Sequence, residues 1–295
     1  MRYAIADNAV VTICDRPCEV RCSDGTPLSA ISDEALYGMG LRITGEAVQG
    51  YLPVATFYGY TGFVSCRDVT EVSLEALQSW EAGLTVTTAF CLDVMSVPKV
   101  QGVKYLSLFA GSLLYLEAWE SEKEGWARVR LIDGRLGYVR NQYLEKKEFS
   151  QSGLWRTELP QKKIVDEASF RKAVVDTART YLGTQYRWGG RSTAGIDCSG
   201  LTSASYMRNG ILTWRDAKIV EGYPVHEISR DEMMPGDLLY FPGHIGMYMG
   251  NGKYIHSTGK IGSGGVVVNS FNPSDSDYRA DLVESLYAVG SIFPQ

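Results

Sequence analysis

Histidine and cysteine are scarce in this chain, and long apolar runs are absent. Only 3 His and 6 Cys occur among the 295 residues. So few thiols on a long chain exclude a small scaffold held together by disulfides. No stretch approaches the roughly 20 apolar residues that a membrane-spanning helix needs. The sequence therefore predicts no membrane contact.

Positive charge is limited as well. The 29 Lys and Arg against 34 Asp and Glu leave a formal net charge of −5, and no dense basic run occurs. Surfaces that bind nucleic acid depend on clustered positive charge, so we expect no nucleic-acid partner. A hydrophobic share of 45% with 21% charged residues is typical of a packed protein, and the length allows one to three domains.

Three cysteines, Cys14, Cys18 and Cys22, lie close enough in the sequence to suggest a metal site. They form no CxxC pair and have no His nearby, so we favour ordinary thiols over zinc and expect no metal. Free thiols fit a reducing compartment modestly better than an oxidising one. Residues 1–8 lack the basic start and apolar stretch of a signal peptide. We expect a cytoplasmic location, with export and a removed signal segment as the alternative.

The first half of the chain has the pattern of two small β-barrels. Short β-prone runs fill residues 1–78, a helix-like segment covers 74–80, and a second β-rich stretch covers 83–148. Residues 60–64 have a counterpart in residues 136–139, where glycine and an aromatic residue precede valine, which suggests a repeat. A polar linker over 149–163 then leads to a third domain over 164–295, with helices predicted at 165–182 and 198–209.

Cys198 occupies a position that suits a nucleophile. It follows a Gly-rich loop and Asp197, a good helix-capping residue, and is predicted in the first turn of a helix. The N-terminal end of a helix stabilises a thiolate and can hold an oxyanion with its N–H groups. A purely structural cysteine is the alternative when this residue is considered alone.

A nucleophilic cysteine needs a base, and two of the three histidines lie downstream. His244 begins a predicted strand, and His256 lies on the next strand after a turn at residues 250–252. As antiparallel neighbours, both side chains can face one site. Two ordinary strand histidines are the alternative. His226, in a loop-like stretch, is predicted to be solvated.

The order of five motifs resembles the NlpC/p60 family of cell-wall cysteine peptidases. The matching segments are residues 186–190, 197–201, 234–238, 243–248 and 254–257. The resemblance implies an α+β chain in which two small SH3b-like β-barrels precede a papain-like catalytic domain. It also implies the catalytic set Cys198, His244 and His256, with the hydroxyl of Tyr186 supporting the oxyanion and with no cofactor.

With two SH3b-like modules, the chain resembles the γ-D-glutamyl-L-diamino acid endopeptidases that process murein stem peptides. That subgroup carries an Arg-Asp motif after the catalytic helix, matched here by Arg215 and Asp216. By this similarity Asp216 pairs with the free amine of an N-terminal L-Ala, and Tyr60 closes the pocket. A surface turn acid and a packed strand tyrosine are the alternatives. We also assign Asp197, Ser199 and Arg215 to substrate binding.

Two departures from the subgroup concern the same pocket. Ala217 stands where a serine is frequent, and the acidic partner from the first barrel is undecided between Glu34 and Glu46.

The expected reaction begins from a thiolate–imidazolium pair of Cys198 and His244, with His256 fixing the ring of His244. The partners are murein stem peptides, L-Ala-γ-D-Glu-diamino acid, and the chain is expected to be a monomer. A wall-targeted hydrolase that uses the barrels to bind polymer is the main alternative. A non-catalytic wall-binding module and a related acyltransferase or amidase are further alternatives. The intact catalytic set argues against the wall-binding module, and the unpermuted motif order argues against the acyltransferase or amidase.

Overall fold

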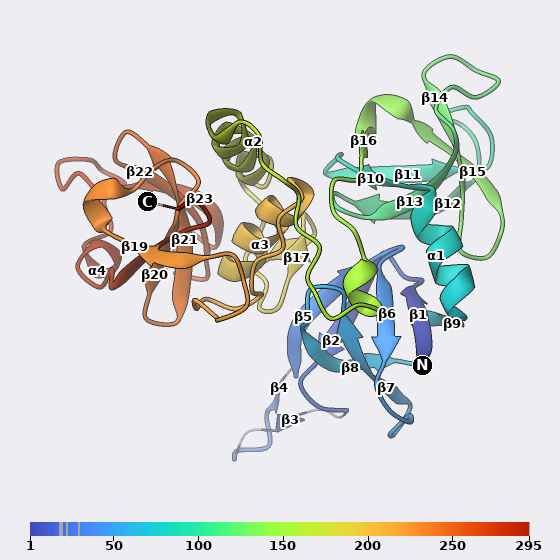
Figure 1. The fold of residues 1–295 in the computed structure, drawn as a ribbon, viewed down its shortest axis with the longest axis horizontal. Coiled ribbons are helices and arrows are strands. Elements are labelled where there is room, and N and C mark those ends of the chain that lie inside the picture. The colour runs from blue at the N-terminus through green and yellow to red at the C-terminus, as the bar shows by residue number, and fades with distance from the viewer. Residues whose placement is uncertain (18–19, 22, 29, 295) are drawn as a thin grey trace. The chain divides into compact units, whose positions relative to one another are not determined.

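The computed structural model describes residues 1–17, 20–21, 23–28 and 30–294. The chain divides into two compact units, Met1–Leu159 and Pro160–Gln295, which can be followed by colour in Figure 1. Cys18 and Cys22 lie outside the described residues. Among the residues that are described, no group of three or more His, Cys, Asp or Glu is placed to hold a metal ion.

The first unit contains two seven-stranded sheets. The first sheet has the order β5 (Ile31–Leu36), β2 (Val10–Cys14), β8 (Thr61–Ser65), β7 (Tyr51–Thr56), β6 (Gly40–Ile43), β1 (Arg2–Ala6) and β9 (Val69–Val72). The second has the order β12 (Lys104–Phe109), β11 (Cys91–Met95), β15 (Leu136–Arg140), β14 (Trp126–Arg130), β13 (Leu113–Ala118), β10 (Leu84–Thr87) and β16 (Leu144–Lys146). A separate two-stranded sheet pairs β3 (Val20–Arg21) with β4 (Pro27–Leu28).

The two sheets repeat one topology. When the strands of each sheet are numbered along the chain, their spatial order is the same in both, and β8 and β15 occupy equivalent places. This equivalence confirms the repeat that residues 60–64 and 136–139 indicated. Helix α1 (Leu74–Ala82) connects the two sheets. The side chain of Ser73 caps its first turn, as expected of serine before a helix.

The two sheets of this unit are joined by specific contacts. Tyr37 leaves the first sheet and packs among core residues of the second, and its hydroxyl accepts a hydrogen bond from the Ile132 N–H at 2.9 Å. Trp80 of α1 donates its indole N–H to the Gly38 carbonyl at 3.0 Å. The short helical turns η1 (Asn141–Tyr143) and η2 (Ser152–Leu154) follow.

The second unit combines helices with a six-stranded antiparallel sheet. Its strand order is β19 (His226–Ile228), β24 (Ala288–Ser291), β20 (Leu238–Phe241), β21 (His244–Gly250), β22 (Lys253–Thr258) and β23 (Gly265–Ser270). A small hairpin pairs β17 (Arg191–Ser192) with β18 (Gly195–Ile196). The helices are α2 (Glu167–Arg179), α3 (Cys198–Arg208), the short turn η3 (Arg230–Glu232) and α4 (Ala280–Val283).

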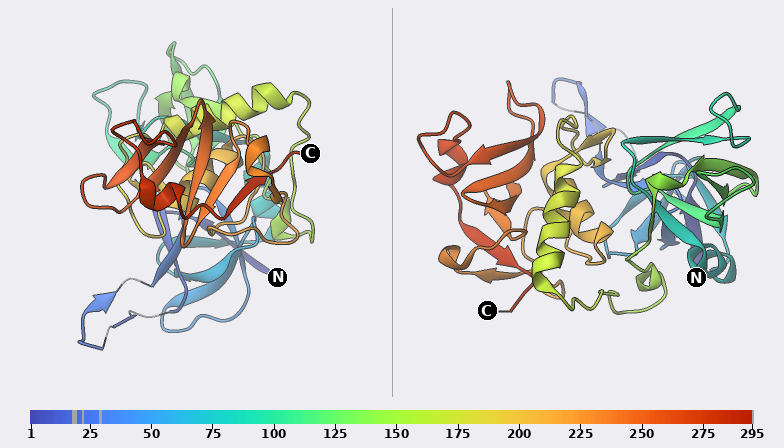
Figure 2. Two further views of the ribbon diagram at one scale, coloured as in Figure 1. Left: turned by 90° about the vertical axis from the view of Figure 1, so that its left-hand side faces the viewer. Right: turned by 90° about the horizontal axis from the view of Figure 1, so that it is seen from above.

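This sheet has a core on each face. One face packs against α2 and α3, and its core includes Ile245 of β21 and Ile255 of β22. The opposite face carries Phe241, Tyr254 and Leu282 of α4. Figure 2 shows α2 running beside the orange-to-red strands. Because strand residues alternate between faces, the neighbours of Ile245 and Ile255, His244 and His256, belong to the second face.

One expectation about this unit was wrong. His226 is exposed, as predicted, but it lies in strand β19 rather than in a loop. The strand is short and pairs with β24 near the C-terminal end of the chain. A strand of this length has too few residues to show alternation, so its pairing could not be read from the local sequence.

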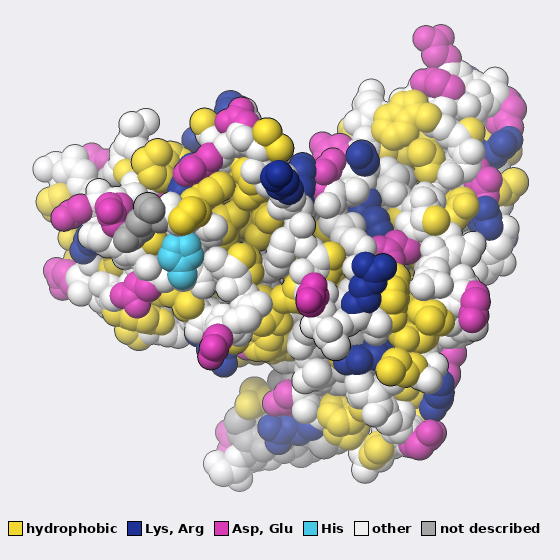
Figure 3. All heavy atoms as spheres, in the orientation of Figure 1, with side chains coloured by type: hydrophobic (Ala, Val, Ile, Leu, Met, Phe, Trp, Pro, Cys, Tyr) yellow, Lys and Arg dark blue, Asp and Glu magenta, His cyan; other side chains and the backbone are white. Residues whose placement is uncertain are grey.

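Within the part of the chain that the structure describes, no helix is long and apolar enough to cross a membrane. On the face of the molecule drawn in Figure 3, acidic and basic side chains are interspersed with apolar and uncharged ones.

Candidate active site

Cys198 is the first residue of helix α3, as the sequence predicted, and Asp197 is the N-cap. The Asp197 side chain accepts a hydrogen bond from the Gly200 N–H at 2.6 Å. A Cβ added at Gly200 would collide with the carbonyl oxygen of Gly190, so the loop before the helix passes too close for any side chain there. The glycines of the motifs at 186–190 and 197–201 therefore permit this close packing.

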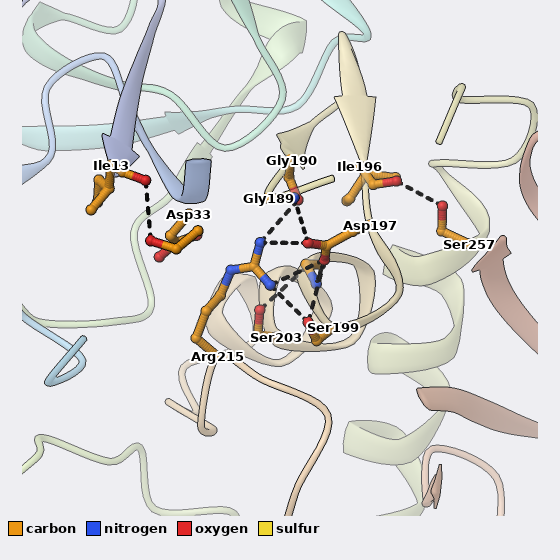
Figure 4. Close-up of polar contacts among 12 residues, drawn as sticks. Ile13, Asp33, Gly189, Gly190, Ile196, Asp197, Ser199, Ser203, Arg215 and Ser257 are labelled. Carbon is orange, nitrogen blue, oxygen red and sulfur yellow. Dashed lines mark hydrogen bonds and ion pairs between the residues drawn. The ribbon is translucent and has the colours of Figure 1, made fainter. Parts of the chain in front are cut away.

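Asp197, Ser199 and Arg215 form one buried network around the start of α3. The Arg215 guanidinium donates to both carboxylate oxygens of Asp197, each at 3.0 Å, and to the Ser199 hydroxyl at 2.8 Å. It also donates to the Gly190 carbonyl at 3.3 Å, while the Gly189 N–H donates to Asp197 at 2.9 Å. Figure 4 shows the guanidinium directed at this cluster. These contacts fix the loop and the helix; substrate binding by the three residues stays a prediction.

The motif at 234–238 has a structural role that the sequence did not reveal. Asp237 is fully buried and pairs with Arg171 of α2 at 2.7 Å. It also accepts a hydrogen bond from the Met234 N–H at 2.8 Å. Tyr206 of α3 donates its hydroxyl to the Gly236 carbonyl at 2.7 Å. The motif thus ties both helices to the start of β20.

The two predicted histidines are brought together. Strands β21 and β22 pair with Tyr248 opposite Tyr254, which puts His244 and His256 on the same face. Their rings contact edge to face, with centroids 5.0 Å apart, and His244 Nε2 lies 2.7 Å from His256 Nδ1. His256 is completely buried. This geometry matches the expected orienting role of His256.

Helix α3, which begins at Cys198, packs against β21 and β22, the strands that carry His244 and His256. The backbone N–H of Ile245, the residue after His244, acts to lower the pKa of the Cys198 thiol. Strand β22 has separated from β21 here, since the register begins only at Met247 opposite Ile255. The hydroxyl of Ser257, on β22, donates to the Ile196 carbonyl at 2.7 Å, as Figure 4 shows.

The surroundings favour uncharged forms of the thiol and both imidazoles. Burial, followed by the Asp197 carboxylate, raises the pKa of Cys198 to about 11, although N–H groups of Ile245 and Ser199 and the Arg215 charge oppose this. Burial, followed by the neighbouring His256, lowers the pKa of His244 to about 3. Burial lowers the pKa of His256 to about 4. Burial thus acts against the expected resting thiolate–imidazolium pair, and that pair stays a prediction.

Tyr186 lies within electrostatic reach of the thiol. Burial raises the pKa of its phenol, and the charges of Cys198 and Asp197 act in the same direction. Its ring packs against Gly259, where an added Cβ would approach ring carbon Cδ1 to 3.3 Å. Its support of the oxyanion stays a prediction.

Asp216 and Ile245 line one small enclosed cavity, together with Thr202 and Thr213. Asp216 is half-buried, and its role in binding an amine stays a prediction.

The residues proposed from the first barrel are described within their own unit. Tyr60 is half-buried in the turn between β7 and β8, and its N–H donates to the Thr56 hydroxyl at 3.0 Å. Glu34 is buried in β5, whereas the Glu46 side chain is 91% exposed and pairs with Arg2. Sequence reasoning overlooked the neighbouring buried acid Asp33, which accepts the Tyr58 hydroxyl at 2.5 Å.

Sequence reasoning also missed Asn269 of β23. Its side-chain oxygen lies 2.8 Å from His256 Nε2. An asparagine after a run of valines is an unusual strand residue, and this was the available signal. Its partner could not be inferred without the register of β22 and β23.

Similarity to known proteins agrees with this geometry. Residues 183–280 match the NlpC/P60 family. A relative named dipeptidyl-peptidase 6, from Lysinibacillus sphaericus, is 39% identical over 263 residues, which cover 88% of this chain and 92% of the relative.

The chain belongs to the NlpC/P60 family. It is also similar to a gamma-D-glutamyl-L-lysine dipeptidyl-peptidase of Bacillus subtilis strain 168, 39% identical over 101 residues. That match covers 30% of this chain and 32% of the relative. The crystal structure of an NlpC/P60 family protein from Bacillus cereus covers 99% of this chain with a TM-score of 0.73 and 18% identity; all of that chain is matched. This likeness supports the α+β fold with β-rich domains before an NlpC/P60 catalytic domain. The family and its relatives support a hydrolase that acts on cell-wall peptides.

Proposed function

We propose that this chain is a cysteine peptidase that hydrolyses the γ-D-glutamyl-L-diamino acid bond of murein stem peptides with a free N-terminal L-Ala. The observation that carries the proposal is the His244–His256 pair, whose ring nitrogens lie 2.7 Å apart on the two strands that pack against α3, the helix that begins at Cys198. The name dipeptidyl-peptidase, borne by a relative that matches most of the chain, supports release of a dipeptide.

In the proposed reaction, His244 acts as a general base toward a neutral thiol. The Cys198 proton moves to His244 as sulfur bonds to the γ-carbonyl carbon, and the resulting oxyanion is held by the Cys198 backbone N–H and the Tyr186 hydroxyl. His244 then gives its proton to the leaving amine as the C–N bond breaks. Water, deprotonated by His244, hydrolyses the thioester and restores the thiol.

A free amine on the substrate calls for a carboxylate in the pocket. A buried ammonium group without a partner is strongly destabilised, so selection for a free N-terminus requires a fixed negative charge. We assign this charge to Asp216, which is half-buried. Peptides with a free L-Ala arise after wall fragments have been trimmed, and we therefore propose a role in peptide recycling in the cytoplasm.

The decisive experiment compares L-Ala-γ-D-Glu-diaminopimelate with the same peptide acetylated at its amine. We expect the wild type to cleave the free peptide rapidly and the acetylated one at least about 100-fold more slowly, because an unpaired buried charge costs several kcal/mol. Cys198→Ala should abolish cleavage of both peptides. Ser203→Ala, which alters another hydroxyl-bearing residue of α3, is the matched control and should keep most of the activity.

Each outcome separates the alternatives. Hydrolysis by Cys198→Ala would remove the assignment of the nucleophile. Equal cleavage of free and acetylated peptides, or preference for intact wall, would keep the cysteine peptidase but favour the wall-targeted hydrolase in which the barrels bind polymer.

A further inference from the structure

Asn269 of β23 makes a hydrogen bond to His256, on the ring nitrogen that does not contact His244. Register places Asn269 opposite Tyr254 and Val267 opposite His256, so the amide reaches His256 diagonally across the strand pair. Asn269 Oδ1 lies 2.8 Å from His256 Nε2, and His256 Nδ1 lies 2.7 Å from His244 Nε2. The Asn269 amide is thus connected through the His256 ring to His244, the proposed base.

The orientation of this amide is set by a backbone carbonyl. Asn269 donates its Nδ2–H to the Asp277 carbonyl oxygen. A carbonyl oxygen accepts hydrogen bonds and cannot donate one. If the amide were turned over, two acceptors would face each other. The Asp277 carbonyl therefore directs the oxygen of Asn269, and not its nitrogen, at His256.

This orientation determines where each imidazole carries its proton. Because Asn269 Oδ1 is an acceptor, His256 Nε2 must be protonated, and in a neutral ring its Nδ1 then has the lone pair. That lone pair accepts the proton on His244 Nε2. His244 is left with its lone pair on Nδ1, the form that can take a proton from a thiol.

Resting on the proposed function, we propose that Asn269 is a positioning residue that, through His256, holds His244 in its Nε2–H tautomer as the base for Cys198.

The segment that carries the Asp277 carbonyl is anchored to the same strands. Lys253, at the start of β22, donates to the side chains of Asp275 at 2.8 Å and Asp277 at 3.2 Å. Ser270, next to Asn269, donates its hydroxyl to Asp275 at 2.7 Å. The carbonyl that orients the amide is therefore fixed relative to the histidine strands.

The charged groups facing the two histidines help to keep them neutral. Burial is the largest cause of both lowered pKa values, and the Arg279 charge lowers them further, whereas Asp281 opposes it. Arg279 and Asp281 form a two-point ion pair before and within α4 at 2.7 and 2.6 Å. The buried Tyr254 ring packs beside His256, with centroids 5.3 Å apart. The proposed tautomers require neutral rings, because a protonated His256 would have no lone pair to accept the proton of His244.

Ring-¹⁵N-labelled histidine tests the tautomers directly, without reference to catalysis. The chain has 3 His, so two-bond ¹H–¹⁵N correlation spectra at neutral pH contain few signals, and His226→Gln assigns the exposed ring. We expect His244 and His256 each to show a protonated Nε2 and an unprotonated Nδ1. A wild-type spectrum with Nδ1–H on either ring would overturn the inference even if the peptidase assay succeeded.

Variants of Asn269 test its part in this arrangement. Asn269→Leu keeps the approximate size but removes the acceptor, so Nδ1–H forms should appear and kcat should fall about 10- to 100-fold with little change in KM. Asn269→Asp keeps the acceptor and should restore both Nε2–H tautomers. Its negative charge raises the pKa of His256, which should move the acid limb of the kcat/KM profile to higher pH. The inference would be overturned if Asn269→Leu kept the wild-type histidine tautomers. It would also be overturned if Asn269→Asp showed the same tautomers and the same kcat as Asn269→Leu. Loss of peptidase activity in wild type alone would instead count against the proposed function.

Discussion

At the scale of single residues, the site depends on burial more than on charge. Cys198 lies at a helix N-terminus, which stabilises a thiolate, but it is also 7% exposed and adjacent to the Asp197 carboxylate. Both histidines are shifted toward their neutral forms. These shifts favour a proton transfer from the thiol during the attack, and a thiolate formed beforehand is the alternative.

Thiol alkylation distinguishes these two states. With the pKa of Cys198 raised to about 11, the thiolate fraction and hence the rate of reaction with iodoacetamide should rise about tenfold per pH unit between roughly pH 7 and 9. A thiolate–imidazolium pair would instead give a rate that is nearly constant over this range. Mass spectrometry of the peptide containing Cys198 separates its signal from those of exposed Cys66 and Cys91.

At the scale of elements, the start of α3 is held by a charged network with one guanidinium at its centre. Arg215 is 1% exposed, and its contacts join Asp197, Ser199 and the loop carbonyl of Gly190. Removal of this cation would leave the Asp197 carboxylate buried with its main ion-pair partner gone. We therefore expect the start of α3, and with it the position of the Cys198 thiol, to be strongly destabilised.

The variant Arg215→Met should lower the free energy of unfolding by about 3–5 kcal/mol, because one member of a buried ion pair is lost. Arg215→Lys keeps the charge but loses the two-point geometry, so we expect an intermediate loss. Arg179→Met, at the exposed end of α2, is the matched control and should change stability by less than about 0.5 kcal/mol. Urea unfolding followed by circular dichroism measures all three. Equal stabilities for the two Met variants would contradict this account.

The elements that carry chemistry were predictable because each has a strong local signal. The Asp197 cap and the glycine turn at 250–252 correctly predicted α3 and the hairpin of β21 and β22. Asn269 was missed because its partner depends on the register of β23 and on a loop carbonyl at Asp277. Likewise, the burial that shifts the pKa of Cys198 comes from packing between distant segments, which no spacing along the chain reveals.

At the scale of the whole molecule, a repeated module precedes a mixed catalytic fold. The identical strand order of the two sheets in the first unit agrees with a repeat that was only faintly visible in the sequence. Little identity is needed to preserve such a topology, because alternation and hairpin turns suffice. The catalytic fold, in contrast, was recognisable from glycines and buried polar residues that close packing requires at particular positions.

Buried neutral histidines should make the stability of the whole molecule depend on pH. In the folded state the pKa of His256 is lowered to about 4, against an ordinary value of 6.5. The unfolded chain therefore binds the proton first as pH falls, and the stabilisation is complete above about pH 6.5 and is lost progressively toward pH 4. The slope attributable to this residue approaches about 1.4 kcal/mol per pH unit. Urea unfolding of wild type and His256→Gln at pH 7, 6 and 5 measures it: the difference in unfolding free energy between the two proteins should shrink as pH falls. A difference that stays constant would mean that the pKa of His256 is the same in the folded and the unfolded protein, which contradicts the lowered pKa.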